Sequence, residues 1–109
     1  NRMKTEKSDT ERREQTIHAL RLCYDPEIPL NIYDLGLIYD IDVDDPDRIS
    51  IRMTLTSPHC PAAEILPRQV KKAVAAMTGV KEVAVTLVWD PPWSINRMSE
   101  EARLELGWL

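Results

Sequence analysis

The chain has 109 residues, enough for one domain with a modest hydrophobic core. Hydrophobic residues make up 43% of it, and 14 basic against 18 acidic residues give a net charge of -4. This balance argues against a nucleic-acid-binding protein and against binding to an anionic membrane, because both need clustered basic residues. No apolar run approaches the roughly 20 residues that span a bilayer. The polar N-terminus shows no secretory signal, so we expect a cytoplasmic protein with a flexible segment, 1–7, before one domain, 8–109.

A capping box predicts that the first helix begins at Ser8. In the sequence SDTE, the Ser8 side chain can accept a hydrogen bond from the amide of Glu11, and the Glu11 side chain can reach back. Beyond it, Ile17, Leu20 and Tyr24 recur at spacings of three and four, which predicts an apolar stripe on a helix of about four turns. The sequence DPEIP then ends the helix, because proline disfavours helical geometry at the residue before it.

Two strands follow this helix. We expect a turn around 34–36 and a strand over 37–43, and the sequence Asp-Asp-Pro-Asp at 44–47 is typical of a second turn. From 49 to 56, apolar residues alternate with polar ones, which is the clearest strand pattern in the chain. The two strands are predicted to form an antiparallel hairpin.

A second helix and a third strand complete the predicted domain. Apolar residues share one face of a helix over 61–78, although Pro67 predicts a kink or a late helix start. A strand over 80–88 follows, and the tail holds a short helix over 99–106. The order α-β-β-α-β, with the third strand parallel to the second, indicates an α+β fold. We therefore expect a two-layer α/β sandwich with a small three-stranded sheet and a C-terminal tail.

The helices are expected to cover one face of this sheet and to leave the other face open. The open face would carry a mixture that is less polar than most free surfaces: Thr54, Thr56, Ala84, Thr86 and Val88. We expect the tail or a second copy of the chain to cover it.

The two cysteines, Cys23 and Cys60, differ in their settings. No Cys-x-x-Cys pair is present, which excludes a zinc ribbon or a thioredoxin-type motif, and a cytosolic chain is not expected to join the two in a disulfide. Cys23 lies beside the apolar stripe and is interpreted as a core residue. Cys60 directly precedes the predicted helix start at Pro61, where unpaired amides and the helix dipole would lower the pKa of the thiol and favour the thiolate.

Two carboxylates and two hydroxyls are candidates to surround this thiol. Asp25 and Glu27 lie in YDPEIP, and Thr54 and Thr56 could donate hydrogen bonds toward the same loop. A nearby carboxylate would raise the pKa of the Cys60 thiol and oppose the helix. In the alternative interpretation, Asp25 forms a turn, Glu27 is solvated, and Cys60 is a small residue buried in a tight loop.

Four segments of the chain carry a family resemblance when they are taken together: YDPEIPLNIYDLGLIYDIDVD, ISIRMTLTSPHCP, TGVKEVAVTLVWDPPW and MSEEARLELGW. In this order they resemble the metal–sulfur cluster biosynthesis family, the SufT-like, DUF59-type iron–sulfur cluster assembly domains. The resemblance covers roughly Ile17 to Leu109 and implies the same small α/β sandwich. The motif residues of the family fall on Asp25, Glu27, Asp34, Leu35, Gly36, Thr54, Thr56, Cys60, Pro61, Asp90 and Trp93.

The resemblance implies an accessory factor in iron–sulfur cluster assembly or delivery to apo-proteins, rather than an enzyme. An iron–sulfur cluster is normally held by four thiolates, so Cys60 alone could be only a transient ligand of iron or of a cluster. We therefore expect no stably bound cofactor. The implied partners are an iron–sulfur scaffold and apo-protein clients. A homodimer, in which a second copy of the chain supplies a second thiolate, is a further alternative.

Three alternatives remain at this point. A PaaD-like accessory subunit for maturation of a phenylacetate-degradation oxygenase usually adds a cysteine-rich extension, and this chain has no cysteine after Cys60. A thiol enzyme would use Cys60 as its nucleophile, with His59, Asp25 or Glu27 as the base. A pure interaction module would use the open sheet face and the DPPW tail, in which Trp93 is expected to be a packing anchor.

Overall fold

The first helix, α1, spans Asp9–Leu20 in the computed structural model, which describes residues 8–57 and 62–107. The predicted capping box is confirmed: Ser8 Oγ accepts a hydrogen bond from the Glu11 amide at 3.1 Å and donates one to the Glu11 carboxylate at 3.3 Å. The apolar stripe ends sooner than expected. Tyr24 lies beyond the helix, pairs with Asn31 in an isolated bridge and is 58% exposed, so its predicted place on the stripe is wrong.

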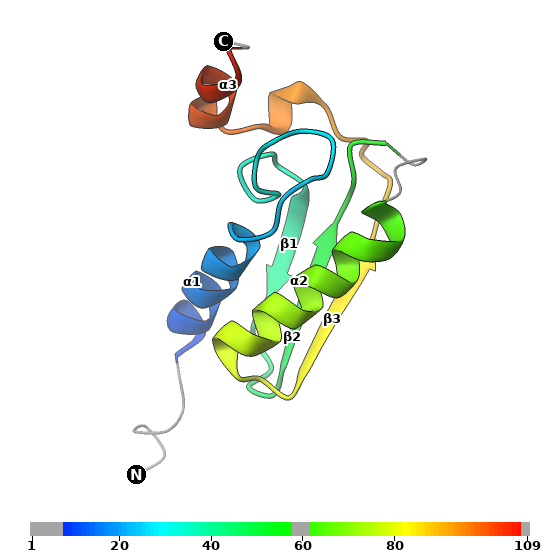
Figure 1. Ribbon diagram of the computed structural model, residues 1–109. Coiled ribbons are helices and arrows are strands. Elements are labelled where there is room, and N and C mark those ends of the chain that lie inside the picture. The colour runs from blue at the N-terminus through cyan, green and yellow to red at the C-terminus, as the bar shows by residue number, and fades with distance from the viewer. Residues whose placement is uncertain (1–7, 58–61, 108–109) are drawn as a thin grey trace.

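The sheet has the predicted topology (Figure 1). Strand β1 (Ile38–Asp42) runs antiparallel to β2 (Arg48–Met53), and β2 runs parallel to β3 (Glu82–Leu87). Ile51 in the central strand pairs with Ile41 on one side and with Val85 on the other. Because alternate residues of β2 are buried, the strand places its apolar side chains on one face, as its sequence predicts.

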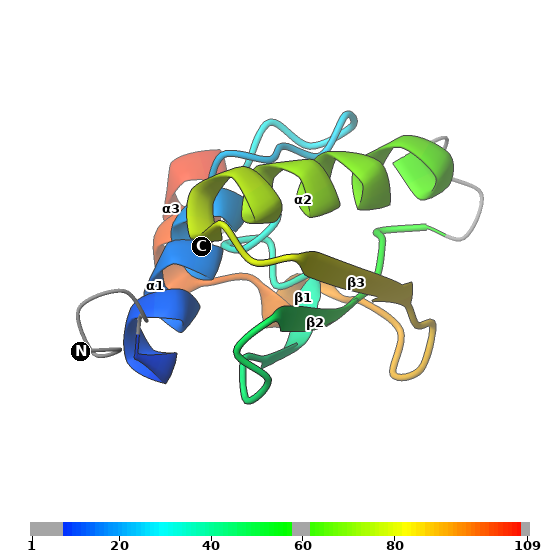
Figure 2. The same cartoon turned by 90° about the horizontal axis from the view of Figure 1, so that it is seen from below.

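Helix α2 (Ala62–Thr78) lies across that apolar face (Figures 1 and 2). Its side chains at Leu66, Val70 and Val74 are almost completely buried. The helix begins before Pro67, so the alternative of a late start is wrong, while the kink stays a prediction. Helix α1 lies at the β1 edge of the sheet and packs against α2, rather than covering the same face as expected. No described helix is long and apolar enough to cross a membrane.

The end of β2 differs from the sequence-based expectation. The strand stops at Met53, and the Thr54 amide donates a hydrogen bond to the Leu37 carbonyl at 2.8 Å. The Thr54 side chain is fully buried just beyond the end of the strand, and its place on the sheet face opposite the core stays a prediction. Thr86 in β3 does remain exposed on that face.

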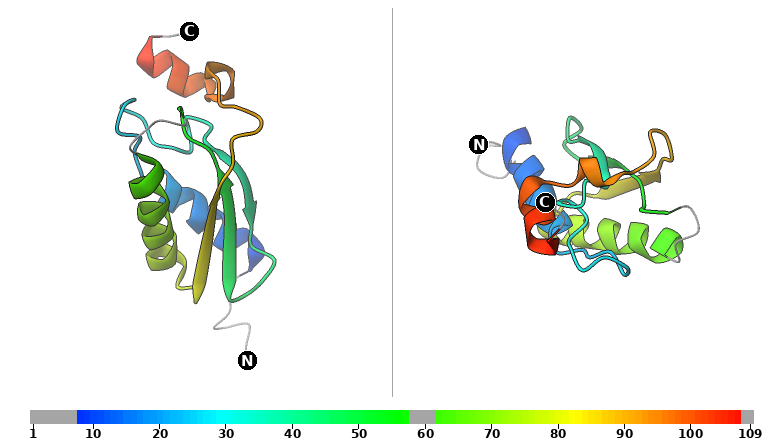
Figure 3. Two further views of the ribbon diagram at one scale, coloured as in Figure 1. Left: turned by 90° about the vertical axis from the view of Figure 1, so that its right-hand side faces the viewer. Right: turned by 90° about the horizontal axis from the view of Figure 1, so that it is seen from above.

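The tail after β3 bows out on the side of the sheet away from α2 and then crosses the end of the molecule (Figure 3). It holds a 3-10 helix, η2 (Ile95–Arg97), and the helix α3 (Glu100–Leu106). The α3 cap is confirmed, because Ser99 Oγ accepts a hydrogen bond from the Ala102 amide at 3.1 Å. The tail meets only one end of the open face, where the Tyr39 hydroxyl donates to the Pro91 carbonyl at 2.7 Å.

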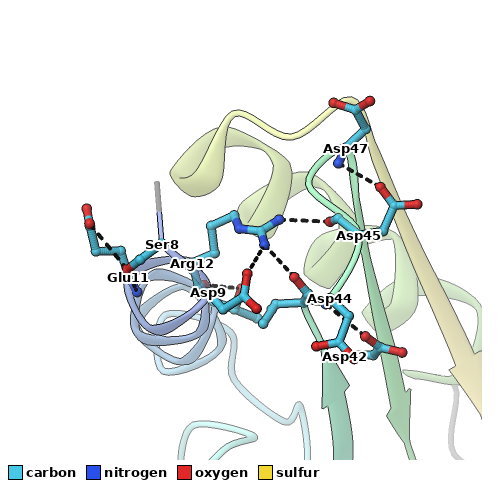
Figure 4. Close-up of polar contacts among 10 residues, drawn as sticks. Ser8, Asp9, Glu11, Arg12, Asp42, Asp44, Asp45 and Asp47 are labelled. Atoms are coloured by element: carbon cyan, nitrogen blue, oxygen red, sulfur yellow. Dashed lines mark hydrogen bonds and ion pairs between the residues drawn. The ribbon is translucent and has the colours of Figure 1, made fainter. Parts of the chain in front are cut away.

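A buried arginine fastens α1 to the β1–β2 turn (Figure 4). The Arg12 guanidinium donates hydrogen bonds to the carbonyls of Val43 and Asp45 and to the carboxylate of Asp9. Arg12 is only 5% exposed. These contacts hold the N-terminal half of α1 against the hairpin, where few apolar residues are available to do so.

Candidate functional site

The candidate site lies at the end of the sheet where β2 and β3 finish and α2 begins (Figure 1). The segment between α1 and β1, residues 21–37, folds over the same end. Chain topology explains the meeting: because β3 is parallel to β2, the two strands end together, and the helix that connects them starts there.

Asp25 is buried in this segment, and only one of its two carboxylate oxygens accepts hydrogen bonds from the described residues. The amides of Glu27 and Ile28 donate hydrogen bonds to Asp25 Oδ1 at 2.7 and 2.9 Å. This is the turn that Asp followed by Pro favours, in which the side chain accepts from the backbone that follows it. Asp25 Oδ2 is buried and receives no hydrogen bond within the described part of the chain, although Asp25 is only 4% exposed.

Thr54, at the end of β2, shows the same property. Its side chain is fully buried, and its hydroxyl oxygen has no hydrogen-bond partner in residues 8–57 or 62–107. Its backbone amide is fixed by the bond to the Leu37 carbonyl. Two of the side chains that the family resemblance selects therefore each hold a buried polar atom that no described group satisfies.

Backbone hydrogen bonds connect these two residues through one framework. The Ile32 amide donates to the Cys23 carbonyl at 2.9 Å, and the Leu37 amide donates to the Ile32 carbonyl at 3.1 Å. Leu37 in turn accepts from the Thr54 amide. The Asp25 turn and the end of β2 are thus held together by the segment between them.

The other predicted site residues are placed differently. Glu27 is exposed, and it contributes its amide rather than its carboxylate to Asp25. Thr56 is half-buried just after the end of β2. Cys60 and Pro61 lie outside the described residues, so the prediction that Cys60 caps α2 stays a prediction.

The motif Asp34-Leu35-Gly36 is the segment to which the C-terminal tail binds. The Asp34 carbonyl accepts from the Ser99 amide at 2.9 Å, and the Leu35 carbonyl accepts from Trp93 Nε1 at 2.6 Å, which confirms Trp93 as an anchor. Gly36 has a φ of 80°, and a Cβ atom there would lie 2.0 Å from the Arg97 carbonyl oxygen. This motif therefore orders the backbone beside the site.

Asn31 holds Asp34 of this motif in place, a role that was not expected from the sequence. Its Oδ1 accepts from the Asp34 amide at 2.8 Å, and its Nδ2 donates to Asp34 Oδ2 at 2.9 Å. Asn followed by Asp three positions later is a variant of the capping-box pattern. The spacing of three residues between Asn31 and Asp34 could have indicated this interaction from the sequence.

Cys23 is confirmed as a core residue. It is 6% exposed, and its thiol donates to the Ala19 carbonyl at a sulfur–oxygen distance of 3.6 Å. Burial raises the pKa of the Cys23 thiol, which keeps it protonated and unreactive. Within residues 8–57 and 62–107, no group of three or more His, Cys, Asp or Glu side chains is placed to hold a metal ion.

Comparisons with known proteins agree on one family. Residues 13–87 match the family described as iron–sulfur cluster assembly protein. A Porphyromonas gingivalis protein named Fe-S protein maturation auxiliary factor is 49% identical over 96 residues, or 88% of this chain and 91% of that protein. The Bacillus subtilis factor YitW, which has the same description, is 44% identical over 95 residues, or 87% and 93% of the two chains.

A solved structure from Bacillus anthracis, described as a domain of unknown function, DUF59, has the same fold. It superposes with a TM-score of 0.84 at 36% identity and covers 98% of both chains. The α+β fold expected from the sequence is therefore found across nearly the whole length of the chain.

Proposed function

Because the chain belongs to the family of iron–sulfur cluster assembly proteins, it is an accessory factor in cluster assembly or delivery, and we propose that Asp25, Thr54 and Cys60 handle its cargo. The cargo is iron or an iron–sulfur cluster that is held in passing. Glu27 and Thr56 border this site.

The observation that carries this proposal is the pair of buried oxygens at Asp25 and Thr54 that receive no hydrogen bond from residues 8–57 or 62–107. Leaving a buried polar group without a partner costs about 1–3 kcal/mol, so stability alone would not favour two of them at one end of the sheet. Ligand-binding groups are a common reason for such exceptions. The Asp25 carboxylate is also prepared for binding, because two amides hold one oxygen and leave the other oxygen available.

The proposed chemistry is ligand exchange without a change of oxidation state. The Cys60 thiolate binds iron of the cargo, and Asp25 Oδ2 offers an oxygen ligand or accepts a hydrogen bond from a cargo-bound group. On delivery, the bond from iron to Cys60 breaks and a bond from iron to a client thiolate forms. The proton that the client thiol loses can pass to the released Cys60 thiolate, so charge and atoms balance.

One thiolate does not complete the coordination of a cluster. The remaining ligands would come from a scaffold protein, from the apo-protein client or from a second copy of this chain. We place this exchange in the cytoplasm, where thiols are kept reduced. In this account the protein carries cargo and performs no catalytic turnover.

Anaerobic loading with ferrous iron and sulfide tests the proposal. We expect the wild-type chain to bind iron, with sulfur-to-iron charge-transfer absorption, and to pass it to an apo-ferredoxin. Cys60→Ala should abolish both, and Asp25→Asn should weaken both while leaving Oδ1 able to accept its two amides. The mass of the loaded species, from light scattering, shows whether a second copy takes part.

The matched control is Cys23→Ala, which removes the other thiol and should leave loading and transfer intact. Equal iron binding by the wild-type and Cys60→Ala chains would contradict the thiolate role. Undiminished transfer by Asp25→Asn would contradict the role of the carboxylate.

A further inference from the structure

A hollow of about 590 Å³ is lined by residues of the sheet and of the tail. The tail runs on the side of the sheet away from α2 (Figure 3). Strand residues Ile38, Tyr39 and Arg52 form one side of the hollow, and tail residues such as Asn96 and Arg97 form the other. No residue of the candidate cargo site lines it. Its lining brings two arginines together and contains no acidic residue.

The guanidinium of Arg97 is held in a defined place. It stacks over the Tyr39 ring at 4.6 Å from the ring centre, and the Tyr39 hydroxyl is itself fixed by its bond to the Pro91 carbonyl. Stacking occupies the flat face of a guanidinium and leaves its N–H edge available to a carboxylate or a phosphate. Arg52 lies in the central strand β2, which pairs with β1 on one side and with β3 on the other.

Neither of these arginines is neutralised within the described part of the chain. Ion pairs link Arg12 with Asp9, Arg21 with Asp34 and Arg48 with Glu82, but none involves Arg52 or Arg97. Asp40 lies opposite Arg52 in the strand pairing, and its carboxylate still forms no ion pair with that guanidinium. The chain has a net charge of -4, but this hollow is lined by two arginines that form no ion pair with any described residue, so its local charge is positive.

We propose that this hollow binds an acidic segment of a partner protein, with carboxylates on Arg52 and Arg97. Paired N–H donors of arginine match a carboxylate in two-point contacts, and the Asn96 amide adds a donor and an acceptor. The lining also contains Ile38 and Pro91, which suit the apolar side chains of a peptide better than a free phosphate ion.

The site would give an assembly factor a way to hold a protein while leaving its cargo site free. Electrostatic complementarity of this kind mainly raises the rate of association and makes the binding selective for one partner. The proposal stands apart from the cargo chemistry, because none of its contacts uses Asp25, Thr54 or Cys60.

The test uses a fluorescent peptide of alternating glutamate and leucine and the full chain, followed by anisotropy. We expect saturable binding that weakens as salt rises. Arg52→Gln and Arg97→Gln should each weaken it about tenfold, as expected for a lost hydrogen bond to a charged group. Arg97→Lys keeps the charge and loses the planar fork, so it should weaken binding less than Arg97→Gln does.

Arg13→Gln is the matched control, because Arg13 is exposed on α1 and lies outside the hollow. It changes the net charge equally and should leave binding intact, as should Cys60→Ala. Thermal unfolding of each variant confirms that the fold survives.

Three results would overturn the proposal. One is equal weakening by Arg13→Gln, which would indicate unspecific attraction. Another is equal binding of a peptide with glutamine in place of glutamate, or displacement by inorganic phosphate at concentrations below that of the peptide. The third is a dimer in light scattering that Arg52→Gln dissociates, which would assign the hollow to a second copy of the chain.

Discussion

Asp25 Oδ2 and the Thr54 hydroxyl are buried oxygens that no described group satisfies, a property that they share with Gln15 Oε1 in α1. Elsewhere the buried threonine hydroxyls are bonded: Thr16 donates to the Arg12 carbonyl and Thr78 to the Val74 carbonyl, each at 2.7 Å. Thr54 has no such partner in the described chain. Comparing these threonines allows the effect of the Thr54 hydroxyl on the free energy of unfolding to be measured.

Replacing Thr54 by valine should raise the free energy of unfolding by about 1 kcal/mol, because it removes a buried hydroxyl that no described group satisfies. The control Thr16→Val deletes a hydroxyl that is bonded and should lower the free energy of unfolding by about 1 kcal/mol. Urea denaturation of both variants gives the comparison. A loss of stability in Thr54→Val as large as that in Thr16→Val would show that the Thr54 hydroxyl is satisfied after all.

Cys23 gives a dependence of stability on pH. Burial raises the pKa of its thiol above the ordinary 9.0, so the unfolded chain releases this proton at a lower pH than the folded chain. The contribution of Cys23 to stability is therefore complete below pH 9.0 and is lost as the pH rises through the pKa of the folded state.

The measurement is the difference in free energy of unfolding between the wild-type chain and Cys23→Ala. This difference should be constant below pH 9.0. Above pH 9.0 the wild-type chain should lose stability relative to Cys23→Ala, because the other titrating groups are common to both chains. Parallel curves across that range would show that Cys23 is not desolvated in the folded state.

The sequence predicted the chemistry of single residues unevenly, for physical reasons. Asp25 and Thr54 were candidates from their expected position around the Cys60 loop, and the family resemblance supported them, since an Asp-Pro turn and an alternating strand also have ordinary structural interpretations. The burial of Thr54 could not be predicted from alternation, because alternation gives the face on which a side chain lies but not what covers that face.

At the scale of elements, sequence patterns predicted α1, α2, α3 and the three strands but not the 3-10 helix η2, and the remaining errors fall at the ends of the predicted elements. Apolar spacing continued to Tyr24, but the backbone leaves the helix after Leu20 and turns back to pair Tyr24 with Asn31. Local patterns do not report such pairings, because the partner lies in another segment. The same limit applies to Arg12, whose sequence context is that of an exposed charged helix face.

Arg12→Met is expected to lower the free energy of unfolding by about 3 kcal/mol. It leaves the carbonyls of Val43 and Asp45 without their charged donor, and breaking one side of a buried polar cluster is strongly destabilising.

The adjacent Arg13→Met is the control, because Arg13 is exposed and its loss should change stability by no more than about 0.5 kcal/mol. Chemical denaturation measures both variants. Similar values for the two would mean that the Arg12 contacts contribute little to the attachment of α1.

At the scale of the whole molecule, the path of the tail could not be derived from the sequence. Its main contacts join residues far apart in the chain: Trp93 Nε1 reaches the carbonyl of Leu35, and Ser99 reaches that of Asp34. The sequence predicted that Trp93 anchors the tail by packing and that Ser99 caps the last helix. The place where both dock became visible only in three dimensions.

Two glycines with similar backbones separate docking of the tail from backbone strain. Gly36 and Gly79 have φ values of 80° and 74°, but only at Gly36 does a Cβ atom meet a neighbour, the Arg97 carbonyl. Gly79→Ala should therefore cost about 1 kcal/mol, from the left-handed backbone alone. Gly36→Ala should cost more than Gly79→Ala, because it also displaces the tail.

Denaturation together with hydrogen exchange of α3 checks this prediction. Gly36→Ala should speed exchange in α3, whereas Gly79→Ala should leave it unchanged. Equal effects of the two variants on α3 would show that the tail does not depend on its contact with Gly36.

The arrangement of the two helices at the ends of the described chain has a practical consequence. Helix α1 starts at one end of the sheet, whereas segment 21–37 and α3 both lie at the other end (Figure 1). Immobilisation through an affinity tag ahead of α1 would leave both proposed binding regions facing the solution. A tag behind α3 would stand close to them and could obstruct the partners that a pull-down is meant to capture.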